Sequence, residues 1–145
     1  MVITSKDNEN IKRIRKLKDK KYRNESGKFL IEGTKLIKEA IEEKAGIDTI
    51  VVCDNCVKNG EIAQDLLYEI AKYNCLYVDE KVFNNITEVQ NPQGLLAVID
   101  KKNTDKDINF SEDIIVILDD IQDPGNLGTI LRTIDSVRAY TGYCI

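Results

Sequence analysis

Residues 114–133 read Ile-Ile-Val-Ile-Leu-Asp-Asp-Ile-Gln-Asp-Pro-Gly-Asn-Leu-Gly-Thr-Ile-Leu-Arg-Thr. The first five of these residues are apolar, continuous and rich in β-branched side chains, which predicts a short buried strand. A turn follows at Pro124 and Gly125, and apolar residues then recur with helical spacing from Leu127 onward. A strand that leads through a tight turn into the N-terminus of a helix forms a site suited to an anionic ligand.

The polar residues of this turn allow two interpretations. Asn126 is able to cap the new helix, and Arg132 carries a planar fork of donors that suits a phosphate or a sugar edge. The alternative is an ordinary strand-to-helix turn with Arg132 on a solvated face, and local physics does not separate the two. The chain contains neither GxGxxG nor GxxxxGK, so a dinucleotide-binding fold and a P-loop NTPase are not supported.

The first hundred residues alternate short apolar runs with helical patterns. We expect one basic helical segment that reaches Arg23, with an apolar stripe at Ile11, Ile14 and Leu17. Strands are expected at residues 29–31, 47–53, 75–78 and 95–99, and further helices at residues 34–41, 62–70 and 79–86. This alternation predicts an α/β layered domain over residues 1–100. Residues 101–111 are polar and aperiodic and are interpreted as a linker, after which residues 112–145 begin a second α/β unit.

The charge of the chain is unevenly distributed. The whole sequence has 21 Lys and Arg against 25 Asp and Glu, but residues 6–28 contain ten cations and only four acids. A local excess of positive charge indicates a polyanionic partner better than the overall charge does, because phosphates are neutralised locally. The candidate nucleic-acid contacts are seven cations on this segment: Lys12, Arg13, Arg15, Lys16, Lys20, Lys21 and Arg23. The alternative is a solvated helix face without a target.

The four cysteines do not indicate a metal site. Cys53 and Cys56 have CxxC spacing, but zinc would need a second pair or histidines, and the chain has no His. A redox motif has no further support, so we favour a structural interpretation in which Cys53 ends a buried strand and Cys56 lies in the following turn. No apolar run is long enough to cross a bilayer, and the N-terminus lacks the features of a signal peptide, so we expect a cytoplasmic protein.

Residues 117–133 resemble the first sequence motif of the SpoU/TrmH group of RNA ribose 2′-O-methyltransferases. The resemblance is specific because Asp, Pro, Asn, Gly, Arg and Thr stand at fixed spacings. The beginning of the chain is also similar to the family's substrate-binding domain, in residues 3–5, 8, 11–12, 16–17, 21–23, 29–33 and 37–40. Residues 90–97 resemble the last strand of that domain, so the similarity extends from residue 1 to about residue 136.

The resemblance implies a ribosomal-protein-like α/β/α substrate-binding domain that binds RNA. The presence of this domain resembles the family's ribosomal RNA enzymes more than its minimal tRNA enzymes. A trefoil-knot domain that binds S-adenosylmethionine and forms homodimers would follow it. The family's motif Asn falls on Asn126 and its catalytic Arg on Arg132. Because free Arg is a very poor base, we expect Arg132 to orient the ribose hydroxyl and to stabilise developing charge.

The sequence also departs from the family. The second and third family motifs, which supply the knot, the cofactor loops and most of the dimer contact, have no counterpart. We therefore expect only the first strand and helix of the trefoil-knot domain, with little structural support, and a chain that retains RNA binding without methyl transfer. A stand-alone RNA-binding module is the alternative.

The last nine residues, 137–145, do not resemble the apolar strand that follows this helix in the family. A plausible coding of this tail, read one base later, gives Leu-Glu-His-Ile-Gln-Asp-Ile-Val, which does. We therefore expect that the tail arises from a shift of the reading frame.

Overall fold

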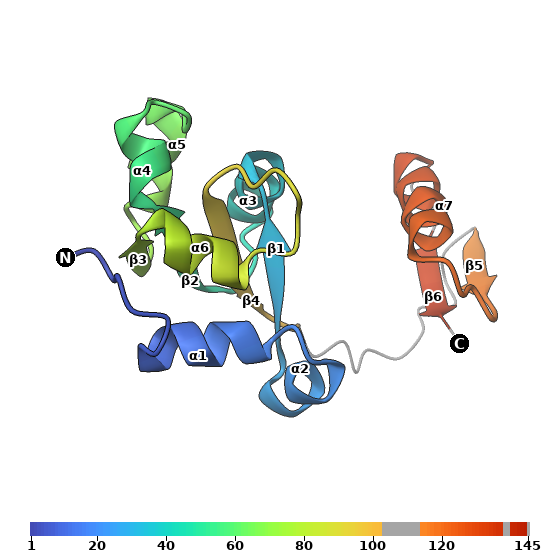
Figure 1. Cartoon of the computed structure of the whole chain (residues 1–145). Helices are drawn as coiled ribbons and strands as arrows, with labels where there is room; N and C mark the ends of the chain where they lie inside the picture. Colours follow the sequence, from blue (N-terminus) through green and yellow to red (C-terminus); the bar gives the residue numbers. More distant parts are fainter. Residues whose placement is uncertain (103–113, 138–139, 145) are drawn as a thin grey trace. The chain divides into compact units, whose positions relative to one another are not determined.

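The computed structural model describes residues 1–102, 114–137 and 140–144 (Figure 1). The chain divides into two compact units, Met1–Lys102 and Asn103–Ile145, and each is described by itself. Most of the expected linker lies outside the described residues. Lys101 belongs to the first unit, because its Nζ donates to Asn24 Oδ1 at 3.0 Å and its backbone N–H donates to the Gly27 carbonyl. None of the helices in the described residues could span a membrane.

The first unit is built on a four-stranded mixed sheet with the order β1-β4-β2-β3. Its strands are β1 (Lys28–Glu32), β2 (Ile47–Cys53), β3 (Cys75–Val78) and β4 (Leu95–Asp100). β2 and β3 run parallel, whereas β4 pairs antiparallel with both β1 and β2. An isolated bridge from Ile3 to Val78 brings the N-terminal segment to the outer edge of β3. All four predicted strands are confirmed.

Six helices surround this sheet in residues 1–102. They are α1 (Glu9–Lys16), α2 (Lys20–Ser26), α3 (Thr34–Glu42), α4 (Asp54–Lys58), α5 (Gln64–Ile70) and α6 (Glu80–Ile86). The predicted cap of α6 is confirmed, because Asp79 Oδ1 accepts from the Val82 N–H at 2.7 Å. The interpretation of Cys56 as a turn residue was wrong, since it lies within α4, a short helix that the apolar spacing did not predict.

The expectation of a single basic helix through Arg23 was also wrong. α1 ends at Lys16 and α2 begins at Lys20, because Asp19 caps the second helix. Its Oδ1 accepts from the backbone N–H groups of Lys21 at 2.7 Å and Tyr22 at 3.2 Å. A short acidic side chain at this position satisfies donors that a continuous helix would have paired with preceding carbonyls.

The core has two halves, one on each face of the sheet, which gives the predicted α/β/α layers (Figure 1). α1 and α6 cover one face, where their apolar side chains pack on Val51 and Val98. α3 and α5 cover the other face and pack on Ile50 and Val52. Residues 50–53 of β2 and 95–99 of β4 are buried on both faces, which explains why they are continuous apolar runs rather than alternating ones.

The second unit consists of β5 (Ile115–Leu118), α7 (Pro124–Ser136) and β6 (Tyr140–Cys144). The predicted strand and helix are confirmed. The sequence predicted only this strand and helix, and β6 is an additional strand that pairs parallel with β5 and completes a βαβ unit. Its sequence, Tyr-Thr-Gly-Tyr-Cys, contains aromatic and β-branched residues that suit a strand, although it lacks the apolar pattern expected of a buried one.

Apolar side chains of the second unit remain exposed. Within residues 114–137, only Leu118 and Ile134 are buried, whereas Ile117 is 65% and Val137 is 61% exposed. A two-stranded sheet with one helix cannot cover both of its faces. The described part of this unit therefore has little core of its own.

Candidate functional site

The basic surface depends on how α1 packs against the sheet. Its apolar residues Ile11 and Ile14 are buried under the sheet face, and the Asn8 side chain caps the helix at the Asn10 N–H. A narrow apolar stripe leaves most of the helix circumference to polar residues. The cations of α1 and α2 are therefore displayed at the surface, but to different degrees.

Two of the seven predicted contacts are bound within the fold. Arg15 Nη1 donates to Asn85 Oδ1 at 3.0 Å and so ties α1 to α6. Arg23 Nη1 donates to the carbonyls of Leu17 at 3.0 Å and Lys18 at 2.7 Å, where α1 ends. These guanidinium groups position the two basic helices. Sequence spacing could not reveal this, because the Arg15 partner lies 70 residues away.

Two further predicted contacts have acidic neighbours on their own helices. Lys12 Nζ lies 3.1 Å from Glu9 Oε1, and Lys21 Nζ lies 3.9 Å from Glu25 Oε1. Exposed ion pairs of this kind contribute little free energy and are readily exchanged for another anion. Both lysines remain candidates for RNA contact, but each carries a local negative charge beside it.

The remaining three cations, Arg13, Lys16 and Lys20, are exposed, and we call them the basic face. Among the ion pairs of residues 1–102, none involves these side chains. Lys16 Nζ lies 5.8 Å from the centroid of the Tyr22 ring, within the range of a cation–π interaction. The basic face is thus the part of the predicted set that presents positive charge to a partner.

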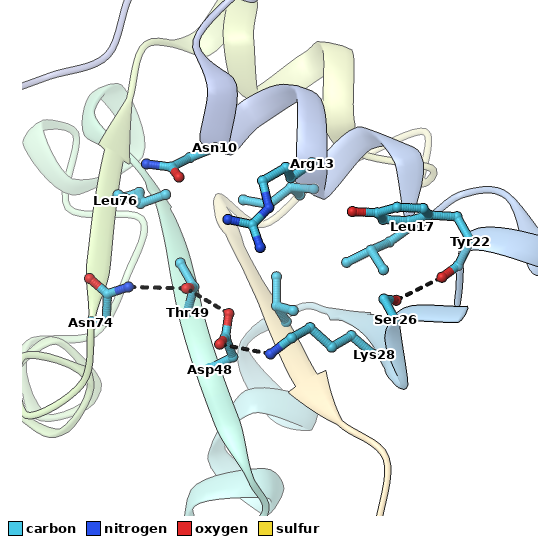
Figure 2. Close-up of a pocket in the computed structure, with 12 residues that line it drawn as sticks. Asn10, Arg13, Leu17, Tyr22, Ser26, Lys28, Asp48, Thr49, Asn74 and Leu76 are labelled. Atoms are coloured by element: carbon cyan, nitrogen blue, oxygen red, sulfur yellow. Dashed lines mark hydrogen bonds and ion pairs between the residues drawn. The ribbon is translucent and has the colours of Figure 1, made fainter. Parts of the chain in front are cut away.

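A cavity of about 510 Å³ lies beside the basic face, between α1, α2 and the sheet (Figure 2). We call it the α1 pocket. Ile14, Leu17 and Val98 line it with apolar surface, and Asn10, Arg13, Tyr22 and Asn74 line it with polar groups. Arg13 was a predicted contact, and Asn10 and Tyr22 lie in the same basic segment of the sequence. Asn74 follows α5, and no motif marks it.

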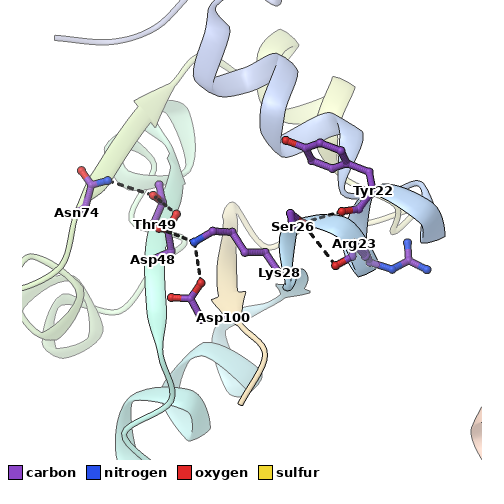
Figure 3. Close-up of polar contacts among 8 residues, drawn as sticks. All are labelled: Tyr22, Arg23, Ser26, Lys28, Asp48, Thr49, Asn74 and Asp100. Atoms are coloured by element: carbon purple, nitrogen blue, oxygen red, sulfur yellow. Dashed lines mark hydrogen bonds and ion pairs between the residues drawn. The ribbon is translucent and has the colours of Figure 1, made fainter. Parts of the chain in front are cut away.

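A chain of hydrogen bonds crosses one wall of this pocket (Figure 3). Asn74 Nδ2 donates to Thr49 Oγ1 at 3.1 Å, and Thr49 Oγ1 donates to Asp48 Oδ2 at 3.0 Å. Lys28 Nζ donates to Asp48 Oδ1 at 2.8 Å and to Asp100 Oδ1 at 2.7 Å. The hydrogen bonds to Asp100 and then to Asp48 raise the pKa of Lys28, and the Lys28 hydrogen bond lowers the pKa of Asp48.

These pKa shifts predict a pH dependence of folding. Asp48 has a folded pKa below its ordinary 3.8, so its stabilising effect is present above that value and is lost as the pH falls through the folded pKa. Lys28 has a pKa above 10.5, so its contribution is present below that value and is lost only in strong alkali. We expect Lys28→Met to reduce the loss of stability that protonation of Asp48 causes in acid, because the Lys28 hydrogen bond is the largest cause of the low Asp48 pKa. The effect should be under about 1 kcal/mol because the pair is partly exposed.

Urea unfolding of both proteins between pH 3 and pH 6 measures this difference. The free energy of unfolding of the wild type should fall more steeply toward pH 3 than that of Lys28→Met. Parallel curves for the two proteins would show that the Lys28 contacts do not set the acid response.

The CxxC pair has the properties of a packed structural element. Cys53 is buried at the end of β2. Burial first, and then the hydrogen bond with Cys53, raises the pKa of the Cys56 thiol to about 12. A thiol with so high a pKa is not a nucleophile at neutral pH, which argues against a redox dithiol. The described residues contain no cluster of side chains able to hold a metal ion.

The strand-turn-helix site of the second unit is built around Asp123. Its Oδ1 accepts from the Asn126 N–H at 2.6 Å, and Pro124 opens α7. The prediction that Asn126 caps this helix was therefore wrong. Pro124 has no N–H to satisfy and a fixed φ suited to the first helical position, so the cap falls on the residue before it.

Arg132 folds back along α7 toward this turn. Its Nη2 lies 3.4 Å from Thr129 Oγ1, and a Cβ at Gly128 would lie 3.7 Å from its Nη1. Thr129 and Asn126 line an open hollow of about 530 Å³ at the start of the helix. The structure thus brings Asn126 and Thr129 to one hollow, with Arg132 in contact with Thr129.

This hollow does not by itself fit S-adenosylmethionine. Its polar lining residues Asp120, Gln122 and Asp123 are all exposed, so the described residues form no enclosed apolar site for an adenosine group.

Comparison with known proteins identifies the first unit. Residues 8–97 match the family described as the MRM3-like substrate binding domain. The chain belongs to this family. Over 134 residues it is 34% identical to the 23S rRNA (guanosine(2553)-2'-O)-methyltransferase RlmP of Bacillus subtilis, which covers 92% of this chain and 50% of that protein. The mitochondrial rRNA methyltransferase 3 of Homo sapiens is 28% identical over 123 residues, covering 81% of this chain and 28% of that protein.

Solved structures agree with the SpoU/TrmH resemblance, which is confirmed. The AdoMet-bound rRNA methyltransferase from Sinorhizobium meliloti superposes with a TM-score of 0.75 at 34% identity, covering 96% of this chain and 52% of that one. The SpoU methyltransferase AviRb from Streptomyces viridochromogenes, at 23% identity and a TM-score of 0.75, shares the fold. The chain spans about half the length of the curated relatives such as RlmP.

Proposed function

We propose that this chain is the RNA-binding part and the beginning of the catalytic part of a ribosomal RNA ribose 2′-O-methyltransferase that uses S-adenosylmethionine. The observation that carries the proposal is the match of residues 8–97 to a substrate-binding domain whose α1 and α2 expose the basic face. Lys and Arg side chains on one surface provide the electrostatic, sequence-independent part of RNA affinity. The first unit has two hydrophobic core clusters of its own. This supports RNA binding by the first unit without the second.

For the second unit we propose the roles that the family motif implies. Asn126 and Arg132 would belong to the methyl-transfer site, with Arg132 orienting the target ribose hydroxyl and stabilising charge rather than removing the proton. The contact of Arg132 with Thr129, beside the hollow that Asn126 lines, supports this assignment. The proposal includes a cytoplasmic location. It places the homodimer in the complete enzymes of the family, since this chain lacks most of the family's dimer contact.

The RNA-binding part of the proposal predicts a strong salt dependence. Fluorescence anisotropy of a labelled single-stranded RNA should show tight binding at low salt that weakens linearly on a plot of log K against log[NaCl]. Each phosphate contact on a single strand contributes a slope of about −0.7, so the basic face with Lys12 and Lys21 predicts about −2 to −3.5. If the RNA does not bind, or if its affinity does not change with salt concentration, RNA recognition by this surface is refuted.

These 145 residues by themselves should not hold the cofactor. Because the hollow beside α7 is open to solvent and does not enclose a ligand, calorimetric titration with S-adenosylmethionine should give no saturable heat at micromolar concentrations. The same preparation should bind RNA, which controls for folded protein. Saturable cofactor binding would mean that the described part of the second unit suffices for the site.

A further inference from the structure

The α1 pocket has the size and the mixed lining of a small-ligand site. Its volume of about 510 Å³ lies within the range of about 300–1,000 Å³ that such sites occupy. Ile14, Leu17 and Val98 provide apolar surface, whereas Asn10 and Asn74 bring amide groups that both donate and accept hydrogen bonds. Apolar walls with a few amides suit a flat, neutral heterocycle.

The charged wall of the pocket has one ammonium and two carboxylates, so its net charge is negative. The Lys28 ammonium contacts both Asp48 and Asp100, so the charged wall has no positive charge to spare for a phosphate. Arg13 is the remaining cation of the lining and is exposed. In Figure 2 the Arg13 side chain reaches from α1 toward the pocket. The other two residues of the basic face follow along the chain, Lys16 at the end of α1 and Lys20 at the start of α2. An anion is therefore favoured at the mouth and a neutral group inside.

We propose that the α1 pocket takes up one unstacked nucleobase of the bound RNA strand, while Arg13 and Lys16 hold the phosphates on either side of it. This inference rests on the proposed RNA-binding function and adds a site for a single base to it. Proteins that read single-stranded RNA commonly splay out a base against aromatic or Arg side chains and hydrogen-bond its edge. Tyr22 and Arg13 provide the planar groups, and Asn10 and Asn74 the edge contacts.

The direct test is a titration of the ¹⁵N-labelled 145-residue chain with adenosine, guanosine, cytidine and uridine 5′-monophosphates, followed by NMR. At least one nucleotide should shift the side-chain amide signals of Asn10 and Asn74 at millimolar concentration, and ribose 5-phosphate, which has no base, should not. Equal shifts with ribose 5-phosphate, or none with any nucleotide, would overturn the inference.

Variants test the same site with single-stranded RNA. Asn10→Trp places a large ring at an exposed position of α1 and should fill the pocket without disturbing the core. Tyr22→Ala should remove one wall. Each should weaken RNA binding about tenfold, since contacts of a base with aromatic side chains are usually worth that much or more. Tyr68→Ala is the matched control, because Tyr68 is 75% exposed on α5.

The outcomes separate this inference from the function on which it rests. Salt-dependent RNA binding that Asn10→Trp and Tyr22→Ala leave unchanged would overturn the base pocket and leave the basic face intact. Base-dependent NMR shifts without any RNA binding would overturn the proposed function and support the pocket. A loss in both pocket variants, with Tyr68→Ala unaffected, supports both.

Discussion

Replacement of Arg13, Lys16 and Lys20 together by alanine should weaken RNA binding about 100-fold at 0.1 M monovalent salt. Each contact with a single-stranded phosphate adds about 0.7 to the dependence of log K on log[salt], so three contacts account for about two powers of ten at that concentration. The slope itself should become shallower by about 2. Anisotropy titrations of the triple variant and the wild type over a range of NaCl concentrations measure both quantities.

The control for this experiment is a variant with the same net charge. Lys35, Lys38 and Lys72 are exposed on α3 and after α5, away from α1 and α2. Their replacement by alanine also removes three positive charges and takes the net charge from −4 to −7. The control should lose only a few-fold in affinity. Equal losses in the two triple variants would mean that overall charge, rather than the basic face, governs RNA binding.

The architecture of the first unit was accessible from sequence because its central strands are buried on both faces. β2 was predicted with the bounds that the structure shows, Ile47–Cys53, since Gly46 stops the preceding helix and residues 50–53 form a continuous apolar run. The break between α1 and α2 was not accessible, because the helical spacing of apolar residues continues across it. One side chain, Asp19, determines where the first helix ends, because it caps α2.

The candidate site was harder to predict from the sequence, because the sequence does not show which polar side chains already form hydrogen bonds within the fold. Arg15 and Arg13 look alike as residues of one basic helix, yet Arg15 is bound to Asn85 and Arg13 is exposed at a pocket. The α1 pocket itself joins α1, β2 and the end of α5, three segments far apart in the chain. In the second unit, β6 was not predicted because it lacks the continuous apolar run that marked the other strands, and its place is set by backbone pairing with β5.

The second large effect should come from Gly94→Ala, which we expect to reduce the free energy of unfolding by about 2–5 kcal/mol. Gly94 has a φ of +75° directly before β4, and its carbonyl accepts from the Cys53 N–H at 2.9 Å. A Cβ there would lie 2.6 Å from Cys56 Cβ and 3.3 Å from Cys53 Cβ. The substitution therefore combines left-handed backbone strain with a collision against the CxxC pair, and urea unfolding measures the sum.

Gly60→Ala separates these two contributions. Gly60 has a similar φ of +72°, but a Cβ there would meet nothing within 4 Å. It should cost only the backbone strain of about 1–2 kcal/mol. The excess loss in Gly94→Ala then measures how tightly the start of β4 packs on Cys53 and Cys56. Cys56 Sγ, 2.7 Å away from a Cβ at Gly94, is able to rotate, but Cys56 Cβ is fixed to the backbone of α4 and moves only with it. If the two variants lose the same stability, the close approach to Cys56 is relieved at no cost, and the structural role assigned to the CxxC pair is wrong.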